Sequence, residues 1–365
     1  MKKIFCILLL LPHLLHAELE ENSPCQNLTD HIGIRTISED ELNDIRATSN
    51  SGATWTQPLI IDSSNPNFTN NSLYQLESNI VYNPGLKYVY PSTYSDYPAA
   101  IIVAKDNMTI DLNGFNLSLS PASAANFLTN NPTYGIAVYQ GVKNLKIISS
   151  GTLSQKGSIT GFSGYAIYAT GILQSYNTYD IFSNYIKNLT IDNILITQNI
   201  NGIYVLNAIQ VSITNTAVIY NFSARPLFGI NFTNVLNGFI ELCRINQNYS
   251  LSDIIAIILR DTTNAQVTDC EISSNRCIVD GNATGIKISA VGGGLLSSEG
   301  NSIKNCNINR NLCSYTASKT SIGINIASGS LHNVIDSCNA DLHGNVPSSA
   351  SPPSPLPTGI GIQID

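Results

Sequence analysis

The chain has 365 residues, of which 43% are hydrophobic and only 12% are charged. Soluble domains carry about 25% charged residues, so this chain is either embedded in a membrane or rich in buried strands and uncharged turns. After the N-terminus, no apolar run approaches the roughly 18 residues of a membrane-spanning helix. We therefore expect a body in which strands supply the core and Asn, Ser, Thr and Gly form the turns.

Residues 1–17 have the layout of a secretory signal segment. Lys2 and Lys3 form its basic start, an apolar run extends from Ile4 to Leu15, and Ala17 offers a cleavage point. The alternative is that the segment is retained as a membrane anchor. In either case we expect a secreted, periplasmic or cell-surface protein with no membrane span beyond this segment.

The charge balance bears on the partners. Removal of Lys2 and Lys3 with the signal segment leaves 16 basic against 25 acidic residues. Nucleic acids and anionic membrane surfaces attract basic patches. The balance therefore argues against both as partners.

Residues 18–98 are predicted to form a leader and an N-terminal cap. Ser38 and Glu41 form a capping box ahead of apolar residues, which predicts a short helix over residues 38–46. The stretch that follows is rich in Asn, Pro, Ser and Tyr. It contains strand-like pieces at Leu59–Ile61 and Tyr74–Val81, and a buried strand is expected at Ala99–Lys105.

From residue 99 to residue 365 two short motifs alternate. One reads Gly-apolar-x-apolar, as in Gly202-Ile203-Tyr204-Val205. The other follows about a dozen residues later and reads apolar-x-x-Cys/Thr-x-apolar, with a leading apolar residue that we call the anchor. The anchors are Ile110, Ile147, Ile191, Ile213, Ile240, Val267, Ile303 and Ile335. An Asn or Gln stands three residues before most of them, and Gly300 and His332 break that series.

This pattern predicts a β-solenoid. Each motif alternates apolar and polar residues, which is the period of a strand with one buried face. Short strands that recur at such intervals are typical of stacked coils. The distance from the Gly to the anchor is nearly constant, whereas the return to the next Gly varies. One side of each coil therefore has a nearly fixed length, and another side carries the insertions.

The segment from Ile101 to Gly114 and the later Ile-x-x-Cys-x-Ile units resemble the right-handed parallel β-helix proteins of the pectate-lyase-like fold. The resemblance covers residues 99–365 and implies an all-β, single-stranded solenoid of about 8–10 coils with a short N-terminal capping helix. This fold hosts lyases, hydrolases, epimerases, esterases and adhesins, so it implies no single activity. Gly361–Asp365 begins a further coil, and we expect the stack either to end uncapped there or to continue in a longer chain.

Six cysteines fall into two columns of the repeat. Four of them follow an anchor by three residues, and Cys277 and Cys313 follow their partners by seven. The four are Cys243, Cys270, Cys306 and Cys338. A disulfide ladder and a row of free thiols are the two alternatives. Parallel side chains about 4.8 Å apart exceed the roughly 3.8 Å Cβ separation of a disulfide, which favours free, inward-facing thiols. The cysteines lack the spacing of metal ligands, so no metal site is predicted.

The catalytic sets of enzymes with this fold are not found. Polygalacturonase-type hydrolases need paired carboxylates together with Gly-His-Gly and Arg-x-Lys motifs. Elimination-type lyases need an Arg-x-x-Pro-x-x-Arg setting, and Arg225-Pro226 is followed instead by Leu-Phe-Gly-Ile. Asp253, Arg260 and Asp261 are the candidate catalytic residues, for which a calcium or uronate site is weighed against solvated surface charge. No cofactor is evident, and calcium is expected only if the protein is a lyase.

Tyrosines provide the candidate ligand-binding residues. Five of them fall within 21 residues, in what we expect to be a long loop before Ile191: Tyr165, Tyr168, Tyr176, Tyr179 and Tyr185. A tyrosine offers an apolar ring and a polar tip, which suits a sugar or a protein partner. The alternative is an insertion packed on itself. A second set is expected to cap the first coil, and it consists of Tyr82, Tyr88, Tyr90, Tyr94 and Tyr97.

Two functions follow from these observations. The first is an exported β-helix protein that binds a polysaccharide or another surface macromolecule without catalysis. The alternative is a divergent polysaccharide lyase, glycoside hydrolase or related enzyme that acts on an acidic polysaccharide. Three or more convergent charged side chains in a groove would favour the enzyme.

Overall fold

The computed structural model describes residues 53–64, 68, 72–84, 90–120, 132–151, 155–172, 182–291, 297–313, 319–341, 344–345 and 359–365. All of them belong to one compact unit, Ile37–Asp365. The signal segment, the helix expected over residues 38–46, Tyr88, Tyr176 and Tyr179 lie outside the described residues.

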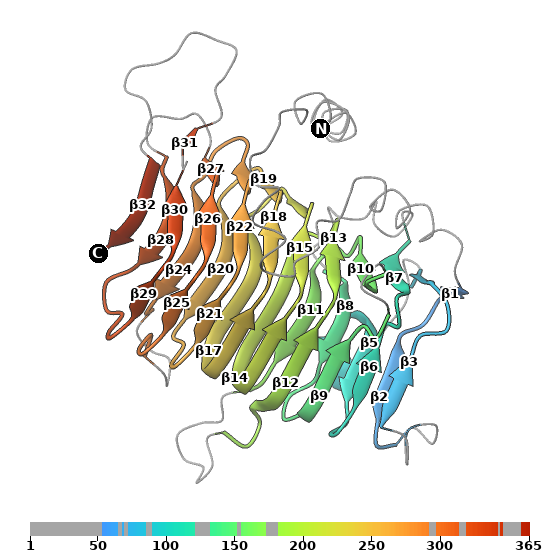
Figure 1. Cartoon of the computed structure of the whole chain (residues 1–365). Helices are drawn as coiled ribbons and strands as arrows, with labels where there is room; N and C mark the ends of the chain where they lie inside the picture. Colours follow the sequence, from blue (N-terminus) through green and yellow to red (C-terminus); the bar gives the residue numbers. More distant parts are fainter. Residues whose placement is uncertain are drawn as a thin grey trace. The chain divides into compact units, whose positions relative to one another are not determined.

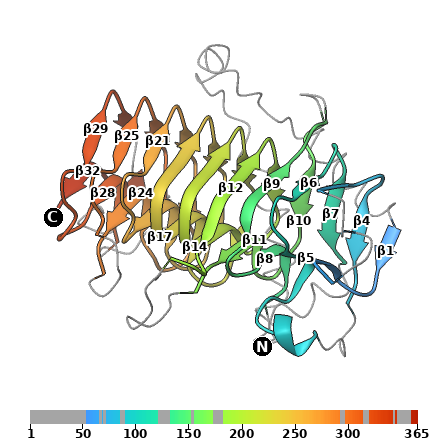
Figure 2. The ribbon, with the colours of Figure 1, turned by 90° about the horizontal axis from the view of Figure 1, so that it is seen from below.

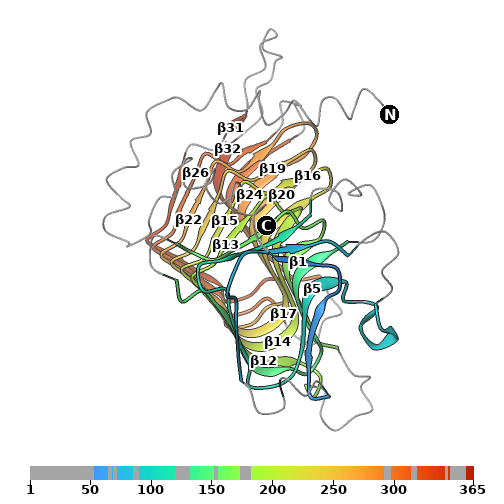
Figure 3. The same ribbon diagram turned by 90° about the vertical axis from the view of Figure 1, so that its right-hand side faces the viewer.

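The strands wind as a right-handed parallel β-helix, which confirms the fold expected from the sequence (Figure 1). Within the described residues, three parallel sheets of 17, 10 and 5 strands run along the stack. Seen along the stack in Figure 3, the sheets surround a common interior. Parallel pairing already begins with the first strands of residues 53–82, ahead of the boundary expected at residue 99.

The 17-stranded sheet contains two arms of each coil. We call the arm that carries the Gly motif the Gly arm and the arm that carries the anchor residue the anchor arm. In β14 (Asn201–Thr214) and β17 (Leu227–Glu241), one long strand passes through both arms. The other Gly-arm strands are β2 (Leu59–Asp62), β5 (Ala99–Ala104), β8 (Tyr134–Val138), β11 (Tyr165–Thr170), β20 (Ile254–Arg260), β24 (Ala283–Ser289), β28 (Ser321–Ile326) and β32 (Gly359–Ile364).

The anchor arm forms the row of strands seen from below in Figure 2. Its separate strands are β3 (Leu73–Gln75), β6 (Thr109–Asp111), β9 (Lys143–Ile148), β12 (Ile186–Asp192), β21 (Gln266–Thr268), β25 (Ser302–Lys304) and β29 (Val334–Asp336). The piece expected at Tyr74–Val81 is thus divided between β3 and the later β4 (Ile80–Tyr82), because Leu76 to Asn79 turn the corner between two sheets.

Two further sheets complete the coils. The ten-stranded sheet consists of β1 (Ala53–Trp55), β4, β7 (Asn116–Leu119), β10 (Ser158–Thr160), β13 (Leu195–Thr197), β15 (Ala217–Ile219), β18 (Arg244–Asn246), β22 (Glu271–Ser273), β26 (Asn307–Asn309) and β30 (Asn339–Asp341). The five-stranded sheet consists of β16 (Phe222–Ser223), β19 (Tyr249–Ser250), β23 (Arg276–Cys277), β27 (Leu312–Cys313) and β31 (Gly344–Asn345). The 3-10 helix η3 (Ser92–Tyr94) precedes β5.

The register of the anchor arm confirms the anchors read from the sequence. Every predicted anchor pairs with the next one, from Ile110 opposite Ile147 to Ile303 opposite Ile335. The Asn and Gln residues three positions earlier adopt positive φ values, such as 59° at Asn107, and so bend the chain between the two arms. Gly300 and His332 differ in residue type but keep a positive φ, so the bend continues through them.

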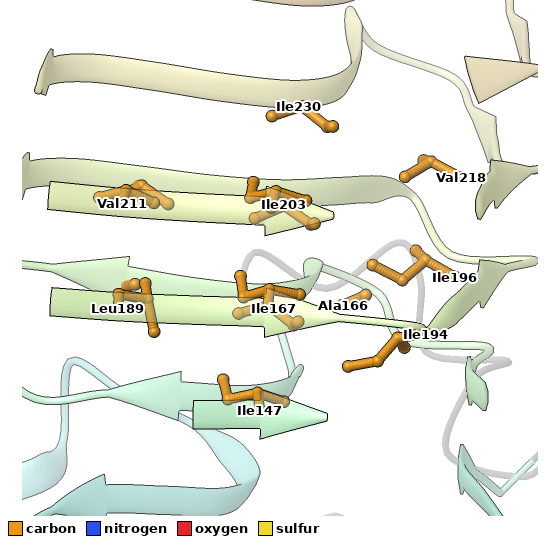
Figure 4. Packing of buried hydrophobic residues seen from close by; sticks show 14 of the residues in the cluster. Ile147, Ala166, Ile167, Leu189, Ile194, Ile196, Ile203, Val211, Val218 and Ile230 are labelled. Carbon is orange, nitrogen blue, oxygen red and sulfur yellow. The ribbon is translucent and has the colours of Figure 1, made fainter. Parts of the chain in front are cut away.

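The interior is a column of branched aliphatic side chains. Figure 4 shows Ile167, Ile203 and Ile230 on successive Gly-arm strands, with Ile196 and Val218 contributed from the ten-stranded sheet. All five side chains have no exposed surface. Neighbouring coils supply equivalent residues, so the core is continuous along the stack.

The first cysteine column lies inside this core as free thiols, which confirms the arrangement expected for it. Cys277 and Cys313 lie in a separate buried cluster with Leu227, Ile254 and Ala283. Cys243, Cys270 and Cys306 are buried, and each thiol donates to the carbonyl oxygen of a residue on the preceding coil. Cys338 continues the column and is partly exposed. Burial raises the pKa of the Cys270 thiol, which keeps that thiol protonated.

Candidate functional site: the outer face of the Gly arm

The outer face of the Gly arm carries a row of tyrosines. Strand pairing places Tyr168 of β11 directly opposite Tyr204 of β14, and the next position along the column is Asn231 of β17. Tyr134 of β8 and Tyr165 of β11 belong to the same face. We call Tyr134, Tyr165, Tyr168 and Tyr204 the tyrosine row.

The rings of the tyrosine row lie against one another. The ring centroids of Tyr134 and Tyr168 are 4.1 Å apart with planes 8° apart, and those of Tyr168 and Tyr204 are 5.6 Å apart with planes 18° apart. Tyr165 lies 5.1 Å from Tyr204. Ring faces are therefore occupied by neighbouring rings, and the edges and hydroxyl groups form the surface.

A second group of tyrosines extends the row toward the N-terminal coils. Tyr97 is 5.2 Å from Tyr139 and 6.2 Å from Tyr168, and Tyr94 is 5.3 Å from Tyr139. The two sets of tyrosines that are separate in the sequence therefore meet on one face. Tyr82 differs, because it has no exposed surface and lies in the core, where its hydroxyl is 2.7 Å from that of Tyr90.

At the opposite end the row meets a polar cluster formed by Asn231, Thr233 and Arg260. Thr233 of β17 is paired with Arg260 of β20. The Thr233 hydroxyl donates to the Asn231 Oδ1 atom over 3.0 Å. Side-chain hydrogen bonds also join Tyr165 to Asn231 and Tyr204 to Thr233. The outer face of the Gly arm therefore changes from aromatic to polar side chains within two coils.

The protonation of this site follows from its burial. Burial raises the pKa of Tyr165 and of Tyr204, and the nearby Arg260 guanidinium opposes that rise without cancelling it. Both phenols are therefore neutral at physiological pH and can donate or accept hydrogen bonds. The Nε atom of Arg260 is buried and has no hydrogen-bond partner in the structure, which leaves one charged donor unsatisfied.

The three candidate catalytic residues do not converge. Asp253 precedes β20 and Arg260 ends it, so their backbones are about 23 Å apart at roughly 3.3 Å per residue. Asp253 accepts the Asn282 N–H over 2.7 Å, and Asp261 accepts the Val291 N–H over 2.9 Å. Both carboxylates thus support turns. A catalytic role for the three residues stays a prediction.

The candidate ligand-binding tyrosines are divided by the structure. Tyr165 and Tyr168 lie in strand β11 and not in a loop, because the Gly arm of this coil already begins at Tyr165. Tyr185 has no exposed surface, and its hydroxyl accepts from the Asn234 Nδ2 atom over 2.5 Å, so it does not share the outer face. Sequence reasoning missed Tyr134 and Tyr204. Tyr204 could have been found by aligning Ile167 with Ile203 in the two Gly motifs, because that alignment places Tyr204 beside Tyr168.

In the parts of the chain that the structure describes, no group of three or more His, Cys, Asp or Glu residues is placed to hold a metal ion. Calcium stays the expectation only for a lyase. The described ranges also contain no helix long and apolar enough to cross a membrane.

No protein-family model matches the chain, and no curated protein matches it. The chain is similar in structure to the surface protein and adhesin PfbA of Streptococcus pneumoniae, with 11% identity over 91% of this chain and 96% of that chain and a TM-score of 0.35. It is also similar to the periplasmic alginate epimerase AlgG, with 12% identity over 85% of this chain and 75% of that chain and a TM-score of 0.32.

A third similar structure is the endo-xylogalacturonan hydrolase from Aspergillus tubingensis. It is 11% identical over 89% of this chain and 96% of that chain, with a TM-score of 0.33. No site residue can be transferred at these identities. The assignment as a parallel β-helix rests on the pairing of the chain's own strands.

Proposed function

We propose that this chain is an exported β-helix protein that binds a polysaccharide along the outer face of the Gly arm. The observation that supports the proposal is the continuous run of side chains from Tyr134 through Tyr204 to Arg260. A tyrosine combines an apolar ring with a polar hydroxyl tip, which suits a sugar with its C–H groups and hydroxyls. The polar cluster adds an amide, a hydroxyl and a guanidinium.

The repeat geometry supports a polymer as the ligand. Equivalent side chains on successive coils recur about every 4.8 Å along the stack. A linear array of similar groups presents similar contacts to successive units of a linear chain. The interaction would therefore gain affinity from several weak contacts, as multivalent binding does.

The arrangement supports binding in preference to catalysis. General acid and base catalysis by carboxyl groups requires two of them placed on either side of the reacting bond. Asp253 and Asp261, which with Arg260 are the candidate catalytic residues, each accept a backbone hydrogen bond in a turn. Arg260 on this face thus serves as a hydrogen-bond and charge partner for the ligand.

A glycan array followed by calorimetry tests the proposal. The purified protein is expected to bind one class of polysaccharide, and Tyr204→Ala and Arg260→Ala are each expected to weaken binding by about tenfold, which corresponds to about 1.4 kcal/mol. Lys304→Ala is the matched control, because Lys304 is exposed on the anchor arm. Equal affinity in all four proteins, with unchanged thermal unfolding, would refute the proposed face.

A further inference from the structure

The geometry points to a covalent modification site: Tyr134 and Tyr168 are placed for oxidative coupling into a dityrosine bridge between coils β8 and β11. The inference stands on ring geometry and does not depend on polysaccharide binding. It concerns a pair that is distinguished within the tyrosine row by its distance, its ring angle and its hydrogen bond.

The two rings are close and nearly parallel. Their centroids are 4.1 Å apart and their planes are 8° apart. The other contacts within the row are wider and more tilted, at 5.6 Å and 18° for Tyr168 with Tyr204 and 5.1 Å and 27° for Tyr165 with Tyr204. The Tyr134–Tyr168 contact is therefore the tightest and most nearly parallel of the ring contacts in the row.

The hydroxyl groups of the pair lie close enough to interact. A side-chain hydrogen bond joins the Tyr134 and Tyr168 hydroxyls. Because the rings are also parallel with centroids 4.1 Å apart, carbons of one ring lie within reach of carbons of the other. The ortho carbons are the atoms that join when two phenoxyl radicals couple.

The two tyrosines meet diagonally across neighbouring strands, because the register places Ala137 opposite Tyr168. Tyr134 begins β8 and Tyr165–Thr170 forms β11, and these strands pair in parallel from Ile136 opposite Ile167 to Val138 opposite Ala169. Tyr134 is 8% exposed, and its neighbours Tyr97 and Ala137 belong to the same buried cluster. The pair therefore meets the geometric condition for coupling before any oxidant arrives.

The reaction balances with hydrogen peroxide and a haem peroxidase as the oxidising system. Each phenol loses one proton and one electron, and the two phenoxyl radicals join through a new ortho C–C bond. The hydrogen atom on each joined carbon then moves to the phenoxyl oxygen, which restores both aromatic rings and both hydroxyls. The protein loses two hydrogen atoms, and one hydrogen peroxide is reduced to two waters.

The partly exposed rings offer a route for the oxidant. Tyr168 and Tyr204 are both partly exposed and in contact, so a radical formed on Tyr204 is passed to Tyr168 across 5.6 Å. Tyr134 is the next ring in the row. The bridge would close a loop between residues 134 and 168, and such a link stabilises a fold mainly by restricting its unfolded state.

Treatment of the dilute protein with peroxidase and hydrogen peroxide tests the inference. We expect a monomer lighter by two hydrogen atoms, blue biphenol fluorescence, and a peptide map that joins Tyr134 to Tyr168. Tyr134→Phe is expected to abolish all three signals, because a phenylalanine ring forms no phenoxyl radical. Tyr165→Phe is the matched control, since it removes a phenol from the same row but leaves the pair intact.

Two results would overturn the inference. One is a map that places the link elsewhere, or a link that persists in Tyr134→Phe. The other is a wild-type protein that forms only intermolecular dimers or no biphenol while its exposed tyrosines are oxidised. Glycan affinity measured on the same samples keeps this outcome separate from the proposed binding function.

Discussion

Tyr204 stands opposite Tyr168 on one side and Asn231 on the other, and its ring is the last of the row that begins at Tyr134. It therefore marks the point at which the outer face of the Gly arm changes from aromatic to polar. The Arg260 guanidinium acts on both Tyr204 and Tyr165, although it lies two coils beyond the first and three beyond the second. This transition within a regular repeat identifies the face as the candidate binding surface.

The repeat motif requires glycine at its first position because a side chain there would collide with the next coil. A Cβ atom on Gly229 would stand 2.5 Å from the Ala256 carbonyl oxygen and 2.8 Å from Ile245 Cγ2. Because the first atom belongs to backbone, Gly229→Ala is expected to lower the free energy of unfolding by about 1–3 kcal/mol. Ala256→Gly, at the equivalent position of the next coil, is the control and should cost only about 1 kcal/mol. Chemical denaturation measures both, and an unchanged Gly229→Ala midpoint would contradict the steric account.

An internal ladder of asparagines supports the coils, and Asn248 shows how. It has no exposed surface, accepts the Asn221 N–H over 3.0 Å, and donates to the Val218 oxygen over 2.9 Å and the Asn275 Oδ1 over 2.8 Å. Asn248→Ala leaves these buried groups unsatisfied and is expected to cost about 2–4 kcal/mol. Asn188→Gly, at an exposed bend with positive φ, should change the free energy of unfolding by less than about 0.5 kcal/mol. A loss below about 0.5 kcal/mol in Asn248→Ala would show that the ladder adds nothing.

Asp111 gives the fold a sensitivity to acid. Burial by itself raises its pKa, but hydrogen bonds from Ser150, Asn113 and Gln75 outweigh burial and hold the pKa below the ordinary 3.8. The folded pKa is lower than the unfolded pKa, so the stabilisation is present above the unfolded value and is lost as pH falls through the folded value.

The measurement for Asp111 is the free energy of unfolding across acidic pH. Wild type should lose stability below about pH 4 more steeply than Asp111→Asn, which lacks the titrating group. Parallel curves for the two proteins would show that other carboxyl groups cause the loss.

The thiol columns predict a pattern of chemical labelling. Cys243, Cys270, Cys277, Cys306 and Cys313 are buried, whereas Cys338 is partly exposed. A thiol reagent applied to the native protein should therefore modify Cys338 first, and all six should react after unfolding without reductant. Peptide mass mapping distinguishes the sites. Unreactive cysteines in the unfolded protein would show disulfides and contradict the free-thiol column.

The stack of coils could be predicted from the sequence because the signals that define each strand and bend lie within a few residues of each other. The anchors from Ile110 to Ile335 follow the strand period, and the residues before them adopt the left-handed bend that Asn favours. Strand register could be read directly from these two signals. The inward cysteines followed from the same alignment.

The site was harder to predict because it depends on which coils lie next to each other. Tyr134 and Tyr168 are 34 residues apart, and Tyr204 and Arg260 are 56 apart, so no local motif contains them. Closeness in the sequence groups Tyr165 with Tyr185, but Tyr185 is buried and does not share the outer face. Only the register of the Gly arm brings the correct residues onto one face.

The most direct test of the binding face is a crystal structure of the protein with an oligosaccharide from the polysaccharide class that it binds. The account predicts sugar units along the Gly arm, with contacts to Tyr204 and a hydrogen bond or ion pair to Arg260. A ligand bound on the anchor arm or the ten-stranded sheet, with the tyrosine row uncovered, would contradict it.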